Sequence, residues 1–195
     1  SFSRPRSVGL RAIELDEGDR LVGTALTDGQ RDIMLFGSGG KVLRFNEAGV
    51  RTMGRTARGV RGIRLAPDQE MIALIIPEDD CQVLTVSENG YGKRTDVAEF
   101  PIYGRGGQGV IGMQTTDRNG SVVGAVQVLD GEEIMMITDM GTLVRTRVDE
   151  VSVLSRNTQG VRLIRLKEGE HVKGVERIEE DEESGESLVE DDAEN

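Results

Sequence analysis

The sequence predicts an all-β fold, a propeller-like array of four-stranded blades, and three observations lead to this prediction. The chain repeats about every fifty residues, since Gly9-Leu10, Gly59-Val60, Gly109-Val110 and Gly160-Val161 open similar runs. Short apolar stretches rich in β-branched residues alternate with turns rich in Gly and Asp. No segment sustains a 3.6-residue apolar period, so almost no helix is expected. A repeat of this length is typical of arrays of equivalent supersecondary units.

Residues 31–78 contain one full repeat. A short apolar strand is followed by the turn Gly37-Ser38-Gly39-Gly40, a returning strand, a loop rich in Gly and Arg, and two further strands around Ala66-Pro67-Asp68-Gln69. The four strands are expected at 33–36, 41–45, 59–65 and 71–76. Four short strands with turn residues between them suggest one blade per repeat.

The two later repeats follow the same order. Asn89-Gly90 is a strong signal for a tight hairpin, because a type I′ turn needs positive φ at both central positions. The turn at Asp139-Met140-Gly141 occupies the equivalent place in the third. Their strands are expected at 83–86, 91–95, 109–114 and 122–128, and at 134–138, 142–147, 160–166 and 172–178.

These patterns divide the chain into an array and a tail. The array covers residues 1–178, with repeat units at approximately 1–28, 29–78, 79–129 and 130–178. The first unit aligns only with the later half of the others, so the array is expected to be partial and the chain a fragment of a larger protein.

The net charge of −11 is concentrated in that tail. Residues 179–195 hold ten carboxylates and no Lys or Arg, which leaves 25 acids and 24 bases for residues 1–178. A charge block with little apolar content buries too little surface to fold, so a disordered acidic tail is expected.

Catalytic and metal-binding chemistry finds little support in the residues. There is one histidine, His171, and one cysteine, Cys81, which excludes an internal disulfide and a Cys/His metal cluster and favours a reducing compartment. Cys81 follows Asp79 and Asp80, which would raise the pKa of its thiol. The chain lacks an apolar run of about 18 residues, so no membrane span is expected.

Basic residues that keep phase with the repeat are the candidate functional residues. They occur in the loop before each in-phase glycine, in the strand after it and in the hairpin, and equivalent positions in an array fall on the same rim. These cations are Arg4, Arg6, Arg11, Lys41, Arg44, Arg51, Arg55, Arg58, Arg61, Arg64, Lys93, Arg94, Arg105, Arg145, Arg147, Arg156, Arg162 and Arg165. Such a stripe is suited to neutralising the backbone phosphates of duplex DNA bent along a curved rim.

Two alternatives remain open. These arginines could instead pair with the 25 acids of residues 1–178, or the array could be a protein-interaction propeller whose charged stripe meets an acidic partner. Tyr91 and Tyr103 are the only tyrosines and tryptophan is absent, so base stacking on single strands is poorly supported.

Several motifs together resemble the C-terminal DNA-wrapping domain of bacterial DNA gyrase A. They are DIMLFGSGGKVLRF, GVRGIRL, NGYGKRT, GAVQV, IMMITDMGTLVRTRV and RNTQGVRLIR, and the resemblance covers essentially residues 1–178. It implies a β-pinwheel, in which propeller-like blades exchange strands with their neighbours, and DNA wrapped on the basic outer edge. It also implies a role in ATP-dependent negative supercoiling, with the rest of gyrase A and with gyrase B in an A2B2 holoenzyme in the bacterial cytoplasm, associated with the nucleoid.

The chain departs from that family in two places. The family's gyrase box, a QRRGGKG-like loop, lies in the first blade, whereas the nearest echo is Gly104-Arg105-Gly106-Gly107-Gln108-Gly109 in a later repeat. The first blades are therefore expected to be absent. Neither Tyr91 nor Tyr103 has the context of the cleavage tyrosine, so the fragment is expected to be non-catalytic and without cofactors, with ATP and Mg belonging to other parts of the holoenzyme.

Overall fold

Three antiparallel sheets make up the fold in the computed structural model, which describes residue 9 and residues 11–178. The first sheet has the order β3-β1-β2-β6, the second β10-β5-β4-β7 and the third β11-β8-β9. The strands are β1 (Asp32–Gly37), β2 (Lys41–Asn46), β3 (Met71–Ile75), β4 (Gln82–Ser87), β5 (Tyr91–Asp96), β6 (Val110–Ile111), β7 (Val122–Val128), β8 (Glu133–Thr138), β9 (Leu143–Arg147), β10 (Val161–Arg162) and β11 (Val172–Ile178).

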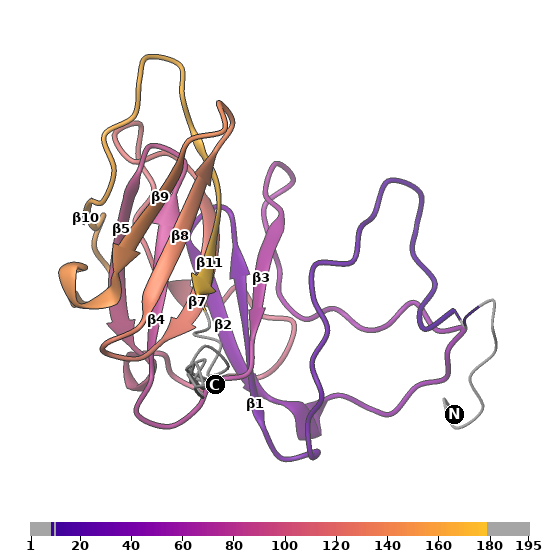
Figure 1. Ribbon diagram of the computed structural model, residues 1–195. Helices are drawn as coiled ribbons and strands as arrows, with labels where there is room; N and C mark the ends of the chain where they lie inside the picture. The colour runs from indigo at the N-terminus through magenta and orange to yellow at the C-terminus, as the bar shows by residue number, and fades with distance from the viewer. Residues whose placement is uncertain (1–8, 10, 179–195) are drawn as a thin grey trace, which may run out of the picture.

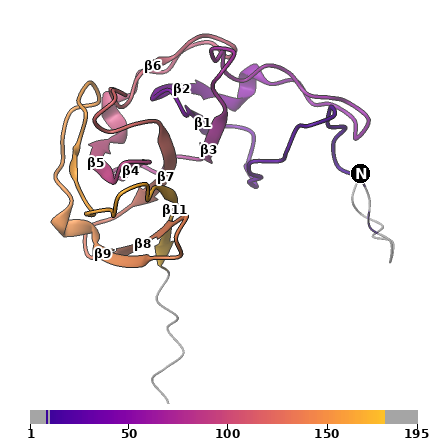
Figure 2. The ribbon, with the colours of Figure 1, turned by 90° about the horizontal axis from the view of Figure 1, so that it is seen from above.

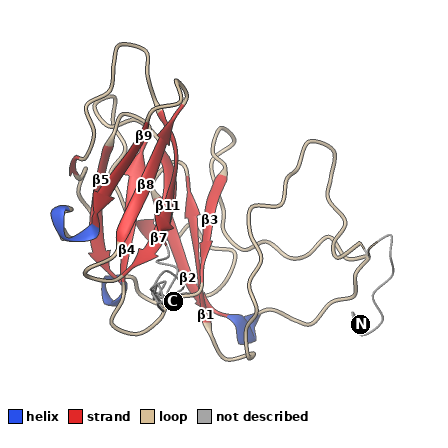
Figure 3. Cartoon of the chain, in the orientation of Figure 1, coloured by secondary structure: helices blue, strands red, loops and turns tan. Residues whose placement is uncertain are grey.

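Helix is confined, in the part of the chain that the structure describes, to three 3₁₀ turns of three residues. Each follows the second strand of a hairpin, as the blue segments of Figure 3 show. They are η1 (Glu47–Gly49), η2 (Val97–Glu99) and η3 (Val148–Glu150). The prediction of an all-β fold with almost no helix is confirmed, and no described helix is long and apolar enough to cross a membrane.

Neighbouring repeats exchange strands. β6 lies in the 79–129 repeat but pairs with β2 of the repeat before it, in the register Lys41↔Ile111 and Val42↔Val110. β10 likewise leaves the third repeat and pairs with β5, in the register Val161↔Gly92. A sheet of four strands therefore combines three strands of one repeat with one from the next.

The in-phase glycines make this exchange possible. Gly109 and Gly160 precede β6 and β10 with φ values of +69° and +78°. A Cβ added at Gly109 would lie 2.2 Å from the carbonyl oxygen of Val42, and one at Gly160 would lie 2.6 Å from that of Gly92. Only glycine combines positive φ with such a close approach of two backbones, which explains why it recurs in phase.

The expected third strands are shorter than predicted, and one is missing. The strands expected at 109–114 and 160–166 reduce to two residues each, and residues 59–65 form no strand. In the described chain no hairpin precedes β1, so 59–65 has no β2-like strand with which to pair. This segment instead bonds to loop 104–107, with Arg64 N–H donating to Gly107 O at 2.8 Å and Gly106 N–H donating to Gly62 O at 2.6 Å.

Apolar cores lie between successive sheets. Met34, Phe36, Val83 and Phe100 belong to the core between the first and second sheets. The core between the second and third contains Leu84, Val86, Ile134, Met136, Val172 and others. The inner strand β7 contacts both β3 and β11.

The sheets follow an arc when seen from above in Figure 2, with β3, β7 and β11 on its inner side. The described residues before Asp32 contain no strand or helix and run away from the sheets, as Figure 1 shows. The outer edge of the arc, as the term is used below, comprises β6, β9, β10 and the loop 50–65. Arg4 and Arg6 and the acidic tail lie outside the described residues.

Candidate nucleic-acid interface

Ten of the predicted cations are exposed at or near the outer edge. They come from the irregular N-terminal segment, the loop 50–65, the edge strand β9 and the segment around β10. These residues are Arg11, Arg51, Arg55, Arg58, Arg61, Arg64, Arg145, Arg147, Arg162 and Arg165.

The loop 50–65 carries five of them. Arg58 pairs with Asp16 at 2.8 Å, but its side chain remains 67% exposed, so the pair is well solvated and weak. No described carboxylate forms an ion pair with Arg51, Arg55, Arg61 or Arg64. These four guanidinium groups are available to an external anion.

The loop 104–109, which contains the nearest echo of the gyrase box, connects two neighbouring repeats through hydrogen bonds. Arg105 is half-buried, and its Nη1 donates to Arg61 O at 2.6 Å while Nε donates to Gly49 O at 3.4 Å. Arg156 is also half-buried, with Nη1 donating to Ile111 O at 3.1 Å. Both side chains tie loops of one repeat to backbone of the repeat before it, and so they hold the outer edge in place.

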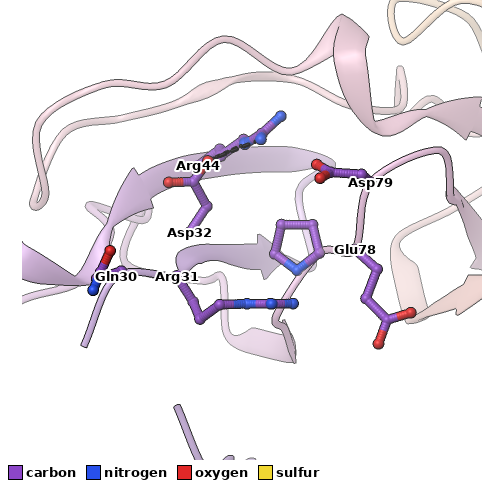
Figure 4. A pocket seen from close by; sticks show the side chains of 7 residues that line it. Gln30, Arg31, Asp32, Arg44, Glu78 and Asp79 are labelled. Atoms are coloured by element: carbon purple, nitrogen blue, oxygen red, sulfur yellow. Dashed lines mark hydrogen bonds and ion pairs between the residues drawn. The ribbon is translucent and has the colours of Figure 1, made fainter. Parts of the chain in front are cut away.

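The hairpin arginines Arg44 and Arg94 do not lie on the exposed rim, and that part of the prediction was wrong. The Arg44 guanidinium forms an ion pair with Asp32 at 2.8 Å, as Figure 4 shows, and donates to Val97 O at 3.1 Å. Only 17% of its side chain is exposed. The pair borders a hollow of about 380 Å³ whose lining includes Glu78 and Asp79, and these carboxylates make it unsuitable for a polyanion.

Arg94 repeats this arrangement one blade later. Its Nε donates to Val151 O at 2.7 Å, and its Nη1 donates to Gln82 Oε1 at 3.0 Å and to the carboxylate of Asp130. Val97 and Val151 belong to or adjoin the 3₁₀ turns of the following repeats. The in-phase arginine is therefore a latch between blades, and its repetition reflects this structural role.

Arg145 holds the equivalent position in the third sheet, but its side chain is 56% exposed. It pairs with Glu133, which is equivalent to Asp32 and Gln82 at the start of the first strand of each hairpin. Among the described residues, no 3₁₀ turn from a following repeat is present to accept its remaining donors. Arg147, next along the edge strand β9, lies 3.8 Å from Asp149 and is 62% exposed.

Lys93 is fully buried, so its placement on the rim was also wrong. Its ammonium donates to Ser155 O at 2.7 Å, to Arg156 O at 2.5 Å and to Thr158 Oγ1 at 3.1 Å. Burial lowers the pKa of Lys93 to about 8, and the Glu99 carboxylate partly offsets this effect. The side chain anchors the loop before β10. Lys41, in contrast, is half-buried at the start of β2.

One cation beside the outer edge was missed by the sequence reasoning. Arg118 lies exposed in the turn between β6 and β7, and its guanidinium carbon sits 4.9 Å from the centroid of the Tyr91 ring. Arg162 approaches the same ring at 5.4 Å. Arg118 is not in phase with the repeat, so periodicity gave no signal for it.

Residues that could support catalysis are not gathered together. Cys81 is buried, and burial followed by the charges of Glu78 and Glu132 raises the pKa of its thiol. His171 lies beside Asp139, with 3.4 Å between Nδ1 and the carboxylate. Within residues 9 and 11–178, no group of three His, Cys, Asp or Glu side chains is placed to hold a metal ion.

Comparisons with known proteins agree with this architecture. The family model described as DNA gyrase C-terminal domain, beta-propeller, matches residues 1–28, 31–78, 82–128 and 132–179. The DNA gyrase A protein of Pseudomonas aeruginosa is 60% identical over 179 residues, which is 92% of this chain and 19% of that protein. The Escherichia coli K12 gyrase A protein is 55% identical over 179 residues, again 92% of this chain and 20% of that protein. The chain thus spans about a fifth of the length of these curated relatives.

Two solved structures share the fold. A DNA gyrase A C-terminal domain superposes with a TM-score of 0.79 at 24% identity, covering 87% of this chain and 58% of that one. The C-terminal domain of a DNA topoisomerase IV gives a TM-score of 0.84 at 24% identity, covering 91% of this chain and 56% of that one.

Proposed function

Because the chain belongs to the DNA gyrase C-terminal domain family, a beta-propeller family, we propose that it binds duplex DNA along the outer edge of its arc and bends it. The observation that carries the proposal is the set of exposed guanidinium groups there that form no described ion pair, foremost Arg51, Arg55, Arg61, Arg64, Arg162 and Arg165. Each is ready to neutralise a phosphate and release a counterion.

The arrangement favours duplex DNA held by its backbone. Backbone contacts fix a duplex on a protein without reading its sequence, whereas a single strand would need aromatic side chains for its bases. Tyr103 is exposed, but Tyr91 is buried, so the outer edge offers no row of stacking rings. Cations spread along an arc suit a duplex whose bending cost is offset by additional phosphate contacts.

The wider role follows from the relatives. We propose that the chain acts as part of a bacterial DNA gyrase A protein, together with gyrase B in an A2B2 holoenzyme in the cytoplasm, associated with the nucleoid. Wrapping would present DNA of fixed handedness to the cleavage core and support ATP-dependent negative supercoiling. ATP and Mg would bind elsewhere in that holoenzyme.

A matched pair of double variants tests DNA binding. Arg55→Ala with Arg61→Ala removes two cations from the outer edge, whereas Lys173→Ala with Arg177→Ala removes two that line the hollow between β3, β7 and β11. In fluorescence anisotropy with a labelled duplex, the first pair should reduce the slope of log K against log salt by about 1.8, since each phosphate contact contributes about 0.9. The second pair should leave it unchanged. Equal effects of the two pairs would contradict the proposal.

A further inference from the structure

Tyr91 brings together two arginines from distant parts of the chain. It begins β5, and its side chain is buried, yet its hydroxyl oxygen accepts hydrogen bonds from Arg162 Nη2 at 2.8 Å and from Arg118 Nε at 3.4 Å. Arg162 lies directly opposite Tyr91 in the β10–β5 pair, and Arg118 comes from the turn before β7. Both guanidinium groups also lie over the ring, a cation–π arrangement that fixes their orientation.

The two arginines of the cluster, Arg118 and Arg162, form no ion pair among the described residues. The two groups border a hollow of about 350 Å³ that is lined by Tyr91, Arg118, Arg162, Leu163, Ile164 and Arg165. Three cations and no acid line this space, and like charges held so close repel each other unless an anion lies between them.

The carboxylate of an adjoining hollow does not neutralise this cluster. Glu170 lines an adjoining hollow. Its carboxylate accepts hydrogen bonds from the hydroxyls of Thr138 and Thr142 and from the backbone N–H of Lys167. These bonds hold the pKa of Glu170 at about 2, and its charge is directed into its own turn. Consistently, hydrogen bonds from Arg118 and then Arg162 lower the pKa of the Tyr91 phenol.

We propose that Tyr91, Arg118 and Arg162 form a seat for one phosphodiester group of the bound duplex. The inference rests on the proposed DNA-binding function and deepens it. Guanidinium groups donate in a planar fork that matches two phosphate oxygens, and charge-assisted bonds of this kind are strong and directional. The Tyr91 hydroxyl accepts one donor from each arginine and leaves the others for the phosphate. Arg165 also lines the hollow and is exposed, so it is available to a duplex that passes along the outer edge.

The seat is specific to the second sheet. In the first sheet the equivalent pair is Lys41 opposite Ile111, which supplies neither an aromatic ring nor a guanidinium group. The other exposed arginines of the outer edge therefore act as separate charges. The seat, in contrast, orients one phosphate and fixes the register of the duplex at this point.

Substitutions that keep the charge distinguish a built seat from a simple cation. Arg162→Lys preserves one positive charge but loses the fork, so it should weaken duplex binding roughly tenfold, as expected for loss of a charge-assisted pair. Tyr91→Phe retains the ring and should weaken binding several-fold without changing the salt slope. Arg177→Lys, on the inner strand β11, is the matched control because it makes the same exchange away from the outer edge, and it should stay within about twofold of the unsubstituted chain. Circular dichroism checks that each variant is folded.

A resonance from the seat itself provides a second readout. With Tyr103→Phe, Tyr91 is the only tyrosine, so ¹³Cζ-tyrosine labelling gives one phenol signal. Addition of a 16-bp duplex should shift this signal and raise the pKa of the phenol, and both effects should be lost with Arg118→Met. If the unsubstituted chain binds the duplex with steep salt dependence, and the Arg162→Lys and Tyr91→Phe variants bind it with the same affinity, the seat is overturned. The proposed DNA-binding function would still stand in that case.

Failure of the chain to bind any duplex would refute the proposed function. In that case a titration with inorganic phosphate, followed by the Tyr91 signal, tests the seat separately. A phosphate-dependent shift of the Tyr91 signal that Arg118→Met removes would support a phosphate seat that serves free phosphate. No shift with phosphate or with duplex would overturn the seat altogether.

Discussion

Replacing Arg94 should destabilise the protein far more than replacing its equivalent, Arg145. The Arg94 side chain is 9% exposed and donates to the Val151 carbonyl at 2.7 Å and to Gln82 at 3.0 Å. Arg94→Met keeps the aliphatic volume but leaves these acceptors without their donor. Hydrogen bonds to a charged group contribute about 1.5–3 kcal/mol each, and the pair with Asp130, which is 80% exposed, adds little. We therefore expect a loss of about 3 kcal/mol.

Arg145→Met serves as the internal control, because the same substitution is made at the same repeat position. Arg145 is 56% exposed and its partner is Glu133, so the loss should be about 0–1 kcal/mol. Urea unfolding followed by circular dichroism measures both. With a slope of about 2 kcal/mol/M, Arg94→Met should lower the midpoint by about 1.5 M and Arg145→Met by less than about 0.5 M. Equal midpoints for the two variants would refute the latch between blades.

Further predictions concern backbone geometry, titration and the tail. Gly160→Ala should detach β10 from β5 and destabilise the fold in urea, because a Cβ would lie 2.6 Å from Gly92 O at a φ of +78°; unchanged stability would contradict the strand exchange. The pKa of Glu170 is about 2 against 4.5, so its contribution is present above pH 4.5 and is lost as the pH falls toward 2; Glu170→Gln should flatten acid unfolding in that window. The pKa of Lys93 is about 8 against 10.5, so the unfolded chain binds more protons between these values, and stability relative to Lys93→Met should rise there. Deleting 179–195 removes ten carboxylates and should tighten DNA binding at low salt, and an unchanged Kd would exclude competition by the tail.

The repeat could be recognised from the sequence because turn residues and glycines recur at equivalent positions in each unit. Asn89-Gly90 and the equivalent turns marked the hairpins, and the in-phase glycines marked a shared backbone geometry. The expected type I′ turn was wrong, because only Gly90 of that pair has a positive φ, at +77°. The segment 59–65 was expected to be a strand because it resembles 109–114 and 160–166. Strand formation there depends on a partner from the preceding blade, and local sequence carries no information about whether that partner is present.

Whether each arginine side chain faces solvent or packs between blades was harder to predict. Residues with a structural role and residues with a functional role can both recur with the period of the repeat. Arg44 and Arg94 recur in phase because each latches two blades together. A signal for this was available, since Asp32, Gln82 and Glu133 each stand twelve residues before the hairpin arginine, within reach across an antiparallel pair. Arg118 lies in a turn whose sequence differs between the repeats of this chain, and folding brings it to Tyr91.

The salt dependence of duplex binding tests the central claim most directly. If exposed guanidinium groups on the outer edge hold the DNA by charge, log K should fall linearly with log salt between about 50 and 200 mM, with a slope of about −5 for six phosphate contacts. The same slope should appear for duplexes of unrelated sequence. A slope near zero, with binding retained, would show that something other than these cations holds the DNA.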